Sequence, residues 1–500
     1  MFPIDHFWRS VRRAPHRPAV ISCDGAISYG DLAARVRRRA AGLLAADPVP
    51  GSTVGVGGDN GIEHLVSLLA VLAARKIWVP LNPRNGDPEL ARIVEFAGPA
   101  ISLVDKALAA RLAAAPGIAL FADLDVDIDN GCPLPLPAAV PPLGATQAIK
   151  FTGGTTGTPK GVQQTYRAWN TNIVTQIHEI GLQQHDRYLV AAPITHGTST
   201  YILPLLAVGG ALVFPGEAGA GPMLDAIAAH RATLSFGPPA LIAMLGDEQR
   251  RAPRKIPSLR CLIAGGAAMR ADQIAAAQSV FGPVIASTFG QTEAPQIAAW
   301  LAPDEMEGAR ALSTGRASLL TEIAILGPGG DPLGPGEEGE IAIRGDLVMS
   351  GYYKAPEQSA EVLVDGWLRT GDVGLLDADG YLFIRDRLRD VIITGGFNVF
   401  PSDVEAVLGN HRDVADCSVI GIADAKWGEA VHAAVTPAHP GEWNPAPVLA
   451  AVRKALGPVK TPKAIHLFDR LPRSPVGKIL KSAIRDEISA RLAANENAGK

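Results

Sequence analysis

Short β-rich runs that alternate with helical segments restrict the fold of this chain more than any other feature of its sequence. The runs lie between about residues 50 and 350 and read TVGVGG, ISLVD, YLVAAP, ALVF, TLSFG, RCLIAGG and PVIASTFG. Ala- and Leu-rich stretches with helical periodicity, such as residues 62–76, separate them. This alternation predicts an α/β fold with largely parallel sheets.

The remainder of the chain departs from that pattern. The runs EIAIRG and YLFIRDR lie among Gly, Pro and Asp residues and predict antiparallel strands or a small β-barrel. From about residue 390 strands and helices are mixed, which predicts a smaller α+β domain. Because 500 residues exceed one ordinary core, we expect a large N-terminal domain, residues 1–386, and a C-terminal domain, residues 387–500. The N-terminal domain would contain two α/β sheet layers and the barrel.

Composition excludes several classes of protein. Charged residues make up 19% of the chain and the formal net charge is −4, so we expect no basic face for nucleic acid. The longest apolar run, residues 65–74, is too short to span a bilayer, and the N-terminus lacks the apolar stretch of a signal peptide. The four cysteines are far apart without CxxC spacing, which predicts neither disulfides nor a zinc cluster and favours the cytoplasm.

The segment FTGGTTGTPKGV, residues 151–162, has the composition of a phosphate-binding loop. Its glycines let backbone N–H groups approach a ligand, its threonines add hydroxyl donors, and Lys160 adds a positive charge. The P-loop of nucleoside triphosphatases ends in Gly-Lys-Ser/Thr, whereas here Pro159 precedes the lysine and Gly161 follows it. A different polyphosphate site, or a plain surface loop, therefore remains.

Five motifs, taken in order, resemble those of the adenylate-forming superfamily, which includes acyl-CoA synthetases, peptide-synthetase adenylation domains and beetle luciferases. They are the loop at 151–162, TFGQTE at 288–293, GWLRTGD at 366–372, DRLRDVIITGGFNVFPSDVE at 386–405 and LPRSPVGKILK at 471–481. The resemblance implies the fold of that superfamily, in which the C-terminal domain is a mobile lid. Its hinge would lie near residues 387–390.

The resemblance also implies a set of nucleotide-binding and CoA-binding residues. Phe289 would offer a flat face to adenine, Asp372 would accept both ribose hydroxyls with its two oxygens, and Glu293 would be a hard oxygen ligand of Mg²⁺. Thr155 would share the metal. The full set is Thr152, Gly153, Gly154, Thr155, Thr156, Gly157, Gly265, Gly266, Ala267, Phe289, Gly290, Asp372, Arg387, Gly395, Gly396 and Phe397.

The implied reaction has two steps. A carboxylate attacks the α-phosphorus of Mg-ATP and gives acyl-adenylate and pyrophosphate, and the thiol of CoA then displaces AMP. The expected catalytic residues are Lys478, Thr292, Glu293, Lys160 and His196. Among them, Lys478 would bridge the carboxylate and α-phosphate oxygens while charge develops, which is electrostatic stabilisation of the transition state. Lys481 has no such role in the superfamily.

Four positions depart from the usual motifs. Gly153 replaces a serine and removes one phosphate-binding hydroxyl, and Phe289 replaces a tyrosine while keeping the flat ring. Thr195 stands where an aromatic residue precedes the histidine, and Arg389 occupies a hinge position that is more often Asp or Lys.

The acid is identified only by class. PITHGTSTYILPLLAVGG, residues 193–210, resembles the acyl-pocket helix of the superfamily, and its small residues leave room for a bulky acid. We expect an aromatic, alicyclic or medium- to long-chain acyl acid, in that order. His196 would gate this pocket or contact the carboxylate, and a purely structural histidine is the alternative. A homodimer is left open.

Three other functions stay open. A stand-alone adenylating enzyme would load a separate carrier protein in place of CoA, and a luciferase-like oxygenase would add an oxidative step. A catalytically silent homologue is disfavoured by Lys160, Glu293, Asp372 and Lys478, which are all present.

Overall fold

The structure is a computed structural model, and it describes residues 1–128, 134–136, 140–152, 160–424, 426–439, 441, 443–474 and 479–498. Within the last helix, the side chains of residues 493 and 495–498 lie outside this description. The chain forms two compact units. Unit 1 comprises Met1–Ile323, Ala342–Arg369 and Gly380–Leu382, and unit 2 comprises Ala324–Ile341, Thr370–Asp379 and Phe383–Lys500.

A seven-stranded sheet forms one layer of unit 1. Its order is β18-β8-β7-β4-β3-β5-β6, and the strands from β7 to β6 pair in parallel. The bounds are β3 Thr53–Gly57, β4 Ile77–Leu81, β5 Ile101–Val104, β6 Ile118–Leu120, β7 Thr146–Thr152, β8 Lys160–Thr165 and β18 Gly351–Tyr352. The connecting helices are α3 Ile62–Ala73, α4 Asp87–Ala97 and α5 Lys106–Arg111.

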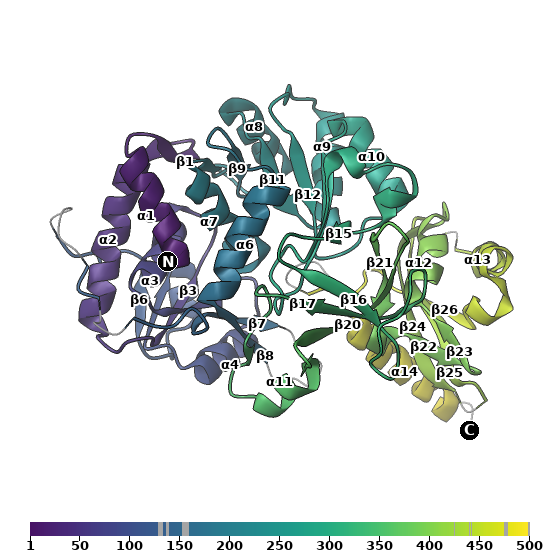
Figure 1. Cartoon of the computed structure of the whole chain (residues 1–500). Coiled ribbons are helices and arrows are strands. Elements are labelled where there is room, and N and C mark those ends of the chain that lie inside the picture. The colour runs from purple at the N-terminus through teal and green to yellow at the C-terminus, as the bar shows by residue number, and fades with distance from the viewer. Residues whose placement is uncertain are drawn as a thin grey trace. The chain divides into compact units, whose positions relative to one another are not determined.

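A nine-stranded sheet forms the second layer, in the order β15-β14-β13-β12-β11-β9-β10-β1-β2. Six of its strands, from β1 to β13 in that order, are parallel. The bounds are β1 Pro18–Ser22, β2 Gly25–Ser28, β9 Arg187–Leu189, β10 Ala211–Val213, β11 Leu234–Gly237, β12 Cys261–Ala264, β13 Ile285–Phe289, β14 Ala299–Leu301 and β15 Arg316–Ala317. Its helices are α8 Ala220–His230, α9 Pro239–Arg251 and α10 Ala271–Phe281 (Figure 1).

Four further helices complete the main body of unit 1. They are α1 Pro3–Arg13, α2 Tyr29–Ala46, α6 Tyr166–Glu179 and α7 Ser199–Val208. Helix α6 follows β8 directly because the Thr165 hydroxyl accepts a hydrogen bond from the backbone N–H of Ala168 at 3.0 Å and caps the first turn. One hydrophobic core joins both sheets to these helices, since it contains Trp78 of β4, Trp169 of α6, Tyr201 of α7 and Ile263 of β12.

A third sheet has the order β16-β17-β20-β19, with β21 beside β20, and the chain passes between the two units within its strands. Its bounds are β16 Glu322–Leu326, β17 Gly339–Arg344, β19 Leu363–Val364, β20 Trp367–Leu376 and β21 Leu382–Arg387. Short helices nearby in sequence are η2 Pro303–Glu305, η3 Gly308–Leu312, α11 Pro356–Val362 and η4 Leu388–Asp390.

Unit 2 contains a fourth sheet, in the order β23-β22-β25-β24 with β26 beside β25. Its bounds are β22 Ile392–Thr394, β23 Phe397–Val399, β24 Val414–Asp424, β25 Gly428–Pro437 and β26 Ala464–Leu467. Its helices are α12 Pro401–Gly409, α13 Pro445–Lys460 and α14 Lys481–Ala498. Apolar residues of α12 and α13 pack on this sheet in one core, and residues of α14 pack on it in a second.

The predicted fold class is confirmed: a large α/β N-terminal part precedes a smaller α+β C-terminal part. The helix expected at residues 62–76 ends earlier, at Ala73, because Arg75 takes a left-handed conformation with φ of 54° and returns the chain to β4. The predicted domain boundary at residues 386–387 and the predicted hinge at residues 387–390 stay predictions.

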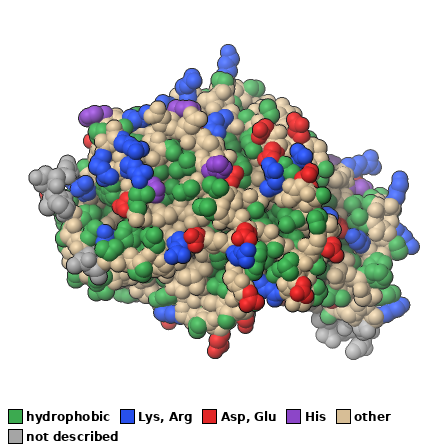
Figure 2. All heavy atoms as spheres, in the orientation of Figure 1, with side chains coloured by type: hydrophobic (Ala, Val, Ile, Leu, Met, Phe, Trp, Pro, Cys, Tyr) green, Lys and Arg blue, Asp and Glu red, His purple; other side chains and the backbone are tan. Residues whose placement is uncertain are grey.

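The surface is of mixed character. Hydrophobic side chains are interspersed with charged and polar ones on the face drawn in Figure 2. In the described ranges, every helix is too short or too polar to cross a bilayer.

Candidate functional site

The ends of the predicted phosphate loop lie side by side. Strands β7 and β8 are antiparallel, and Thr152 is the direct Cα partner of Lys160. The predicted loop residues Gly153, Gly154, Thr155, Thr156 and Gly157 lie outside the described residues, as does Lys478.

Lys160 and Glu293 are brought together through a tyrosine. The Nζ of Lys160 lies 5.1 Å from the ring centroid of Tyr352, and the Oη of Tyr352 donates a hydrogen bond to Oε1 of Glu293 at 2.9 Å. Two predicted site residues that are 133 positions apart in the sequence therefore both contact Tyr352.

The segment after β13 folds back tightly on that strand. A Cβ on Gly290 would lie 2.6 Å from the carbonyl carbon of Gln296, and Gln296 itself has a left-handed φ of 70°. The Thr288 hydroxyl donates to the carbonyl of Gln296 at 2.7 Å. Phe289 is 7% exposed at the end of β13. Only glycine at 290 allows this close approach of two backbone segments.

Thr292 is anchored to the hairpin side of the site. The side-chain amide of Gln164, on β8, donates to the carbonyl oxygen of Thr292 at 2.8 Å, and its Oε1 accepts from Nε1 of Trp169 at 3.0 Å. The backbone of Thr292 is thus hydrogen-bonded to the same hairpin that carries Lys160.

Residues 265–267, which belong to the predicted nucleotide-binding set and resemble the backbone segment beside adenine in the superfamily, follow β12. Gly265 is buried, and a Cβ there would meet Phe236 at 2.8 Å and Thr288 at 2.9 Å. Gly266 has φ of 81° and, like Ala267, is exposed. Their backbone is therefore open to solvent on one side.

His196 lies in a π-helical turn, η1 Ile194–Thr198, that precedes α7. Its φ and ψ of −119° and −136° interrupt the helix, and π turns are frequent at functional sites. Its Nδ1 is 3.0 Å from the Thr195 hydroxyl, and its carbonyl accepts from the Ser199 hydroxyl at 2.6 Å. The residue that replaces the usual aromatic side chain is thus a hydrogen-bond partner of the histidine.

Aromatic rings and one amide crowd the backbone next to His196. A Cβ on Gly197 would lie 2.6 Å from the Phe236 ring and 3.0 Å from Oε1 of Gln296. Tyr201 stacks on Phe236 with centroids 5.2 Å apart and accepts a hydrogen bond from Nε2 of Gln296 at 3.0 Å. The Phe236 ring and an amide oxygen that accepts no hydrogen bond within the described ranges therefore border Gly197, while Tyr201 stacks on both Phe236 and Tyr188.

Lys150, on β7, is a buried amine beside the same segment. Its Nζ lies 2.8 Å from the Ser199 hydroxyl, 5.0 Å from the Trp78 ring centroid and 5.7 Å from that of Trp169. Burial lowers the pKa of Lys150 to about 7. No carboxylate of the described chain forms an ion pair with it.

Asp372 and Arg387 meet in unit 2. Nε of Arg387 lies 2.8 Å from Oδ1 of Asp372, whose side chain is 7% exposed. Arg389 contacts only Asp390, at 4.0 Å, among the ion pairs of the described residues. The two predicted ribose-side residues are thus paired, and Arg389 is not part of that pair.

Gly395 and Gly396 form the turn of the β22–β23 hairpin. Thr394 pairs with Phe397, so the loop has two residues, and their φ values of 58° and 83° are those of a type I′ turn. Phe397 is 60% exposed. Of the predicted CoA-binding residues, Gly395 and Gly396 therefore form a tight turn, and Phe397 follows it with an exposed ring.

Lys481 begins α14 and is tied to α12. Its Nζ lies 3.0 Å from Oε1 of Glu405 and 3.9 Å from Oδ1 of Asp386. Burial alone would lower the pKa of Lys481, but Glu405 and Asp386 raise it on balance, while burial raises the pKa of Glu405. This lysine is a structural cation.

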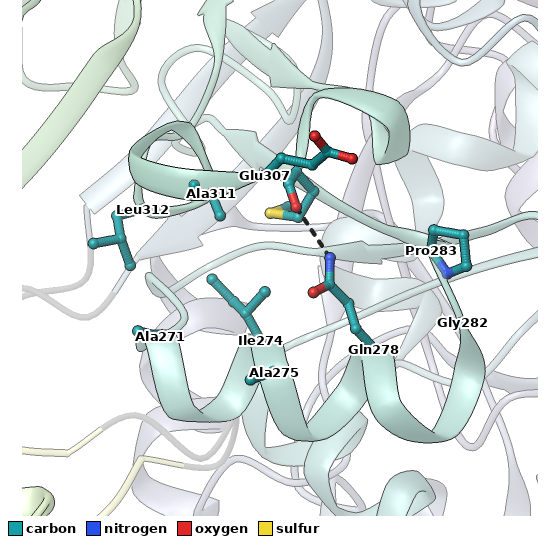
Figure 3. Close-up of a pocket in the computed structure, with 11 residues that line it drawn as sticks. Ala271, Ile274, Ala275, Gln278, Gly282, Pro283, Glu307, Ala311 and Leu312 are labelled. Carbon is teal, nitrogen blue, oxygen red and sulfur yellow. Dashed lines mark hydrogen bonds between the residues drawn. The ribbon is translucent and has the colours of Figure 1, made fainter.

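A hollow of about 570 Å³ lies elsewhere on unit 1 (Figure 3). It lies between α10 and residues 306–312, which include the short helix η3, and Nε2 of Gln278 donates there to the carbonyl of Met306 at 3.1 Å. Its lining includes none of the predicted site residues. The hollow is therefore separate from the candidate site.

Comparison with known families assigns the chain. The family described as AMP-binding enzyme matches residues 7–353, and the AMP-binding enzyme C-terminal domain matches residues 403–478. The chain belongs to the AMP-binding enzyme family.

Relatives of similar length agree. A feruloyl-CoA synthase of Amycolatopsis is 36% identical over 95% of this chain and 97% of its own. A medium/long-chain-fatty-acid–CoA ligase of Mycobacterium tuberculosis is 32% identical over 95% and 88%. The solved structure of an amide bond synthetase of Marinactinospora thermotolerans superposes with a TM-score of 0.88, at 30% identity over 97% and 99%.

The predicted reaction class is confirmed by these comparisons: the chain is an AMP-forming acid–thiol ligase, an acyl-CoA synthetase that uses ATP and CoA. The relatives do not test the individual site residues. The structure adds residues that the motifs did not point to, namely Tyr352, Gln296, Phe236, Tyr201 and Lys150. A Gly-Tyr-Tyr-Lys run at 351–354 was the one visible signal for the first of them.

Lys150→Met is expected to change how stability depends on pH. Between about pH 7 and pH 10.5 the unfolded lysine holds a proton that the folded one has released, so the stability of the wild-type protein rises with pH in that window. Across this pH window, the free energy of unfolding of the variant should fall relative to that of wild type by up to about 1.4 kcal/mol per pH unit. Denaturant unfolding at several pH values would measure this, and parallel pH profiles would contradict the burial of an uncompensated amine.

Gly290→Ala is expected to destabilise unit 1 by about 1–3 kcal/mol, because its Cβ would overlap the backbone of Gln296. Gly144→Ala is the matched control, since nothing lies within 4 Å of the Cβ it would add. Equal unfolding midpoints for the two variants in guanidinium chloride would show that the 290–296 segment yields freely.

Proposed function

We propose that this acyl-CoA ligase activates an aromatic carboxylic acid with Mg-ATP and transfers it to CoA. The observation that carries the proposal is the grouping of Lys160, Tyr352 and Glu293 where the β7–β8 hairpin opens. At this place the side chain of Tyr352 contacts both Lys160, a cation that can bind phosphate, and Glu293, a hard oxygen ligand that can bind a metal. The wide spacing of the cysteines supports a cytoplasmic location.

Glu293 fits a magnesium ion that is held mainly by phosphates. One of its carboxylate oxygens accepts from Tyr352, and the other accepts no hydrogen bond from the described residues. In those residues no cluster of three or more His, Cys, Asp or Glu could hold a metal. Mg²⁺ commonly takes one or two carboxylates and fills its other positions with water and phosphate oxygens. When bound, it would neutralise charge on the phosphate oxygens.

In the first step, a carboxylate oxygen of the acid forms a bond to the α-phosphorus while the bond to pyrophosphate breaks. Lys160 would hold the phosphates beyond the α-phosphorus, and Lys478 would stabilise charge on the carboxylate and α-phosphate oxygens. Phe289 and residues 265–267 would hold adenine, and Asp372 with Arg387 the ribose.

In the second step, the sulfur of CoA forms a bond to the acyl carbonyl carbon and AMP leaves with the carboxylate oxygen. Rotation of the C-terminal domain about residues 387–390 would remove Lys478 and bring the Gly395–Gly396 turn to the acyl-adenylate. A turn of two glycines presents bare backbone, along which a pantetheine arm can pass.

The proposed aromatic class of the acid is supported by the surroundings of His196. The ring of Phe236 lies against Gly197 and packs on Tyr201, so aromatic side chains border the segment next to His196, and an aryl group packs favourably beside such rings. A feruloyl-CoA synthase and an indoleacetate–CoA ligase, each named for an aromatic acid, are among the relatives at 36% and 31% identity.

An amine acceptor in addition to CoA is the second candidate. It is favoured by one observation, the likeness to an amide bond synthetase over 97% of the chain. Such an enzyme would form the same acyl-adenylate, and the nitrogen of an amine would then displace AMP.

The proposal predicts that pyrophosphate release depends on an aromatic acid and that acyl-CoA accumulates when CoA is present. Release would be followed with Mg-ATP and a panel of aryl, alicyclic and fatty acids, and products would be identified by mass spectrometry. Amide formation with added amine, alongside the thioester, would support the second candidate. No release with any acid would overturn the proposal.

Lys478→Ala is expected to lower adenylate formation by about 10²-fold or more, since a charge-stabilising donor is worth that much. It should leave conversion of a supplied acyl-adenylate to acyl-CoA largely intact. Lys481→Ala is the control, because that lysine pairs with Glu405 and should lower thermal stability without separating the half-reactions. Equal loss of both half-reactions in Lys478→Ala would contradict the assigned role.

A further inference from the structure

Tyr352 contacts both candidate groups for the metal–polyphosphate complex. Its hydroxyl donates to Glu293 at 2.9 Å, and its ring face carries the ammonium of Lys160 at 5.1 Å. The tyrosine itself is 7% exposed, so its hydroxyl and ring are held in a largely buried place.

The backbone around Tyr352 is bonded to both neighbouring segments. Strand β18 pairs with β8, where Tyr352 lies opposite Val162. The N–H of Met349 donates to the carbonyl of Glu293 at 2.8 Å, and the N–H of Tyr353 donates to the carbonyl of Gly161 at 2.6 Å. The segment 349–353 therefore joins the start of β8 to the residue that would bind the metal.

A hydrogen bond fixes Tyr352 from its other side. Its N–H donates to the hydroxyl of Ser359, on α11, at 2.8 Å. Gly351 before it has φ of 141°, and a Cβ there would lie 2.9 Å from the same hydroxyl. Glycine is thus required where the chain turns into the tyrosine.

The tyrosine keeps Lys160 and Glu293 apart while it binds both. Across the described chain, neither residue forms an ion pair with any other side chain. A direct pair would hold the ammonium and the carboxylate against each other, away from phosphate and metal. Instead, the hydroxyl of Tyr352 donates only to Oε1 of Glu293. Its ring contacts the ammonium of Lys160 by a cation–π interaction, which is weak enough for phosphate to replace.

We propose that Tyr352 is a positioning residue that couples metal binding to phosphate binding. Its hydroxyl orients the Glu293 carboxylate toward the metal, and its ring orients Lys160 toward the phosphates of the same nucleotide. This inference rests on the proposed function, since that function places Mg-ATP beside these residues.

Tyr352→Phe removes the hydroxyl and keeps the ring. With a non-hydrolysable ATP analogue bound, its affinity for Mn²⁺, followed by electron paramagnetic resonance, should fall by about 10-fold or more, as expected when a partner of a metal ligand is lost. Its affinity for the analogue in the presence of EDTA, measured by calorimetry, should stay within about twofold of wild type, because Lys160 and the ring remain.

Tyr352→Leu removes the hydroxyl and the ring. It should show the same loss of Mn²⁺ affinity and, in addition, weaker binding of the analogue in EDTA. Tyr353→Phe is the matched control: it is the same chemical change one residue further, where the ring packs on Phe96 at 6.0 Å, and neither affinity should move.

The outcomes separate the two claims. Unchanged Mn²⁺ affinity in a folded Tyr352→Phe protein, with wild type binding normally, would overturn the coupling and leave the proposed function intact. A wild-type protein that binds neither the analogue nor Mn²⁺ with it would overturn the proposed function and the inference with it. Equal losses in Tyr352→Phe and Tyr353→Phe would show a general structural effect and also overturn the inference.

Discussion

Burial of one continuous apolar core ties together the two sheets of unit 1 and the helices between which most candidate residues lie. Trp78, Trp169, Tyr201 and Phe236 belong to it and come from β4, α6, α7 and β11. Each large side chain in such a core contributes about 1.5–3 kcal/mol through the area it removes from water. The β7–β8 hairpin, the turn at His196 and the 288–296 segment all lie against this core, so none can move without disturbing its packing.

The elements and their types could be read from the sequence because hydrophobic patterns are local. The parallel strands β3, β5 and β11 to β13 coincide with apolar runs, and the mixture of strands and helices expected from about residue 390 forms as β22 to β26 with α12 to α14. The pairing of Asp372 with Arg387 and the grouping of Lys160 with Glu293 were reachable from motifs, since each motif carries its own residue.

The connecting residues could not be read in this way, because their roles arise from contacts between distant segments. In the sequence, Tyr352 looks like an ordinary aromatic residue of a strand. Its role arises only because β18 pairs with β8, where its partner Val162 lies 190 positions earlier in the chain. Lys150 interrupts an apolar run, as a solvent-facing residue of a strand would, yet it is buried because two tryptophans from β4 and α6 enclose it. Gln296 takes a left-handed conformation that glutamine rarely adopts, where the backbone of Gly290 approaches it closely and the hydroxyl of Thr288 donates to its carbonyl.

The passage of the chain between the two units has a consequence for how this enzyme can be divided. Residues 324–341 and 370–379 belong to unit 2 although unit 1 sequence precedes, separates and follows them. A single break in the polypeptide therefore cannot release either unit whole. A chimaera that exchanged one unit between two homologues would need several crossovers, placed where the chain passes between the units within the third sheet. Recombination at a single point would leave strands without their hydrogen-bonding partners.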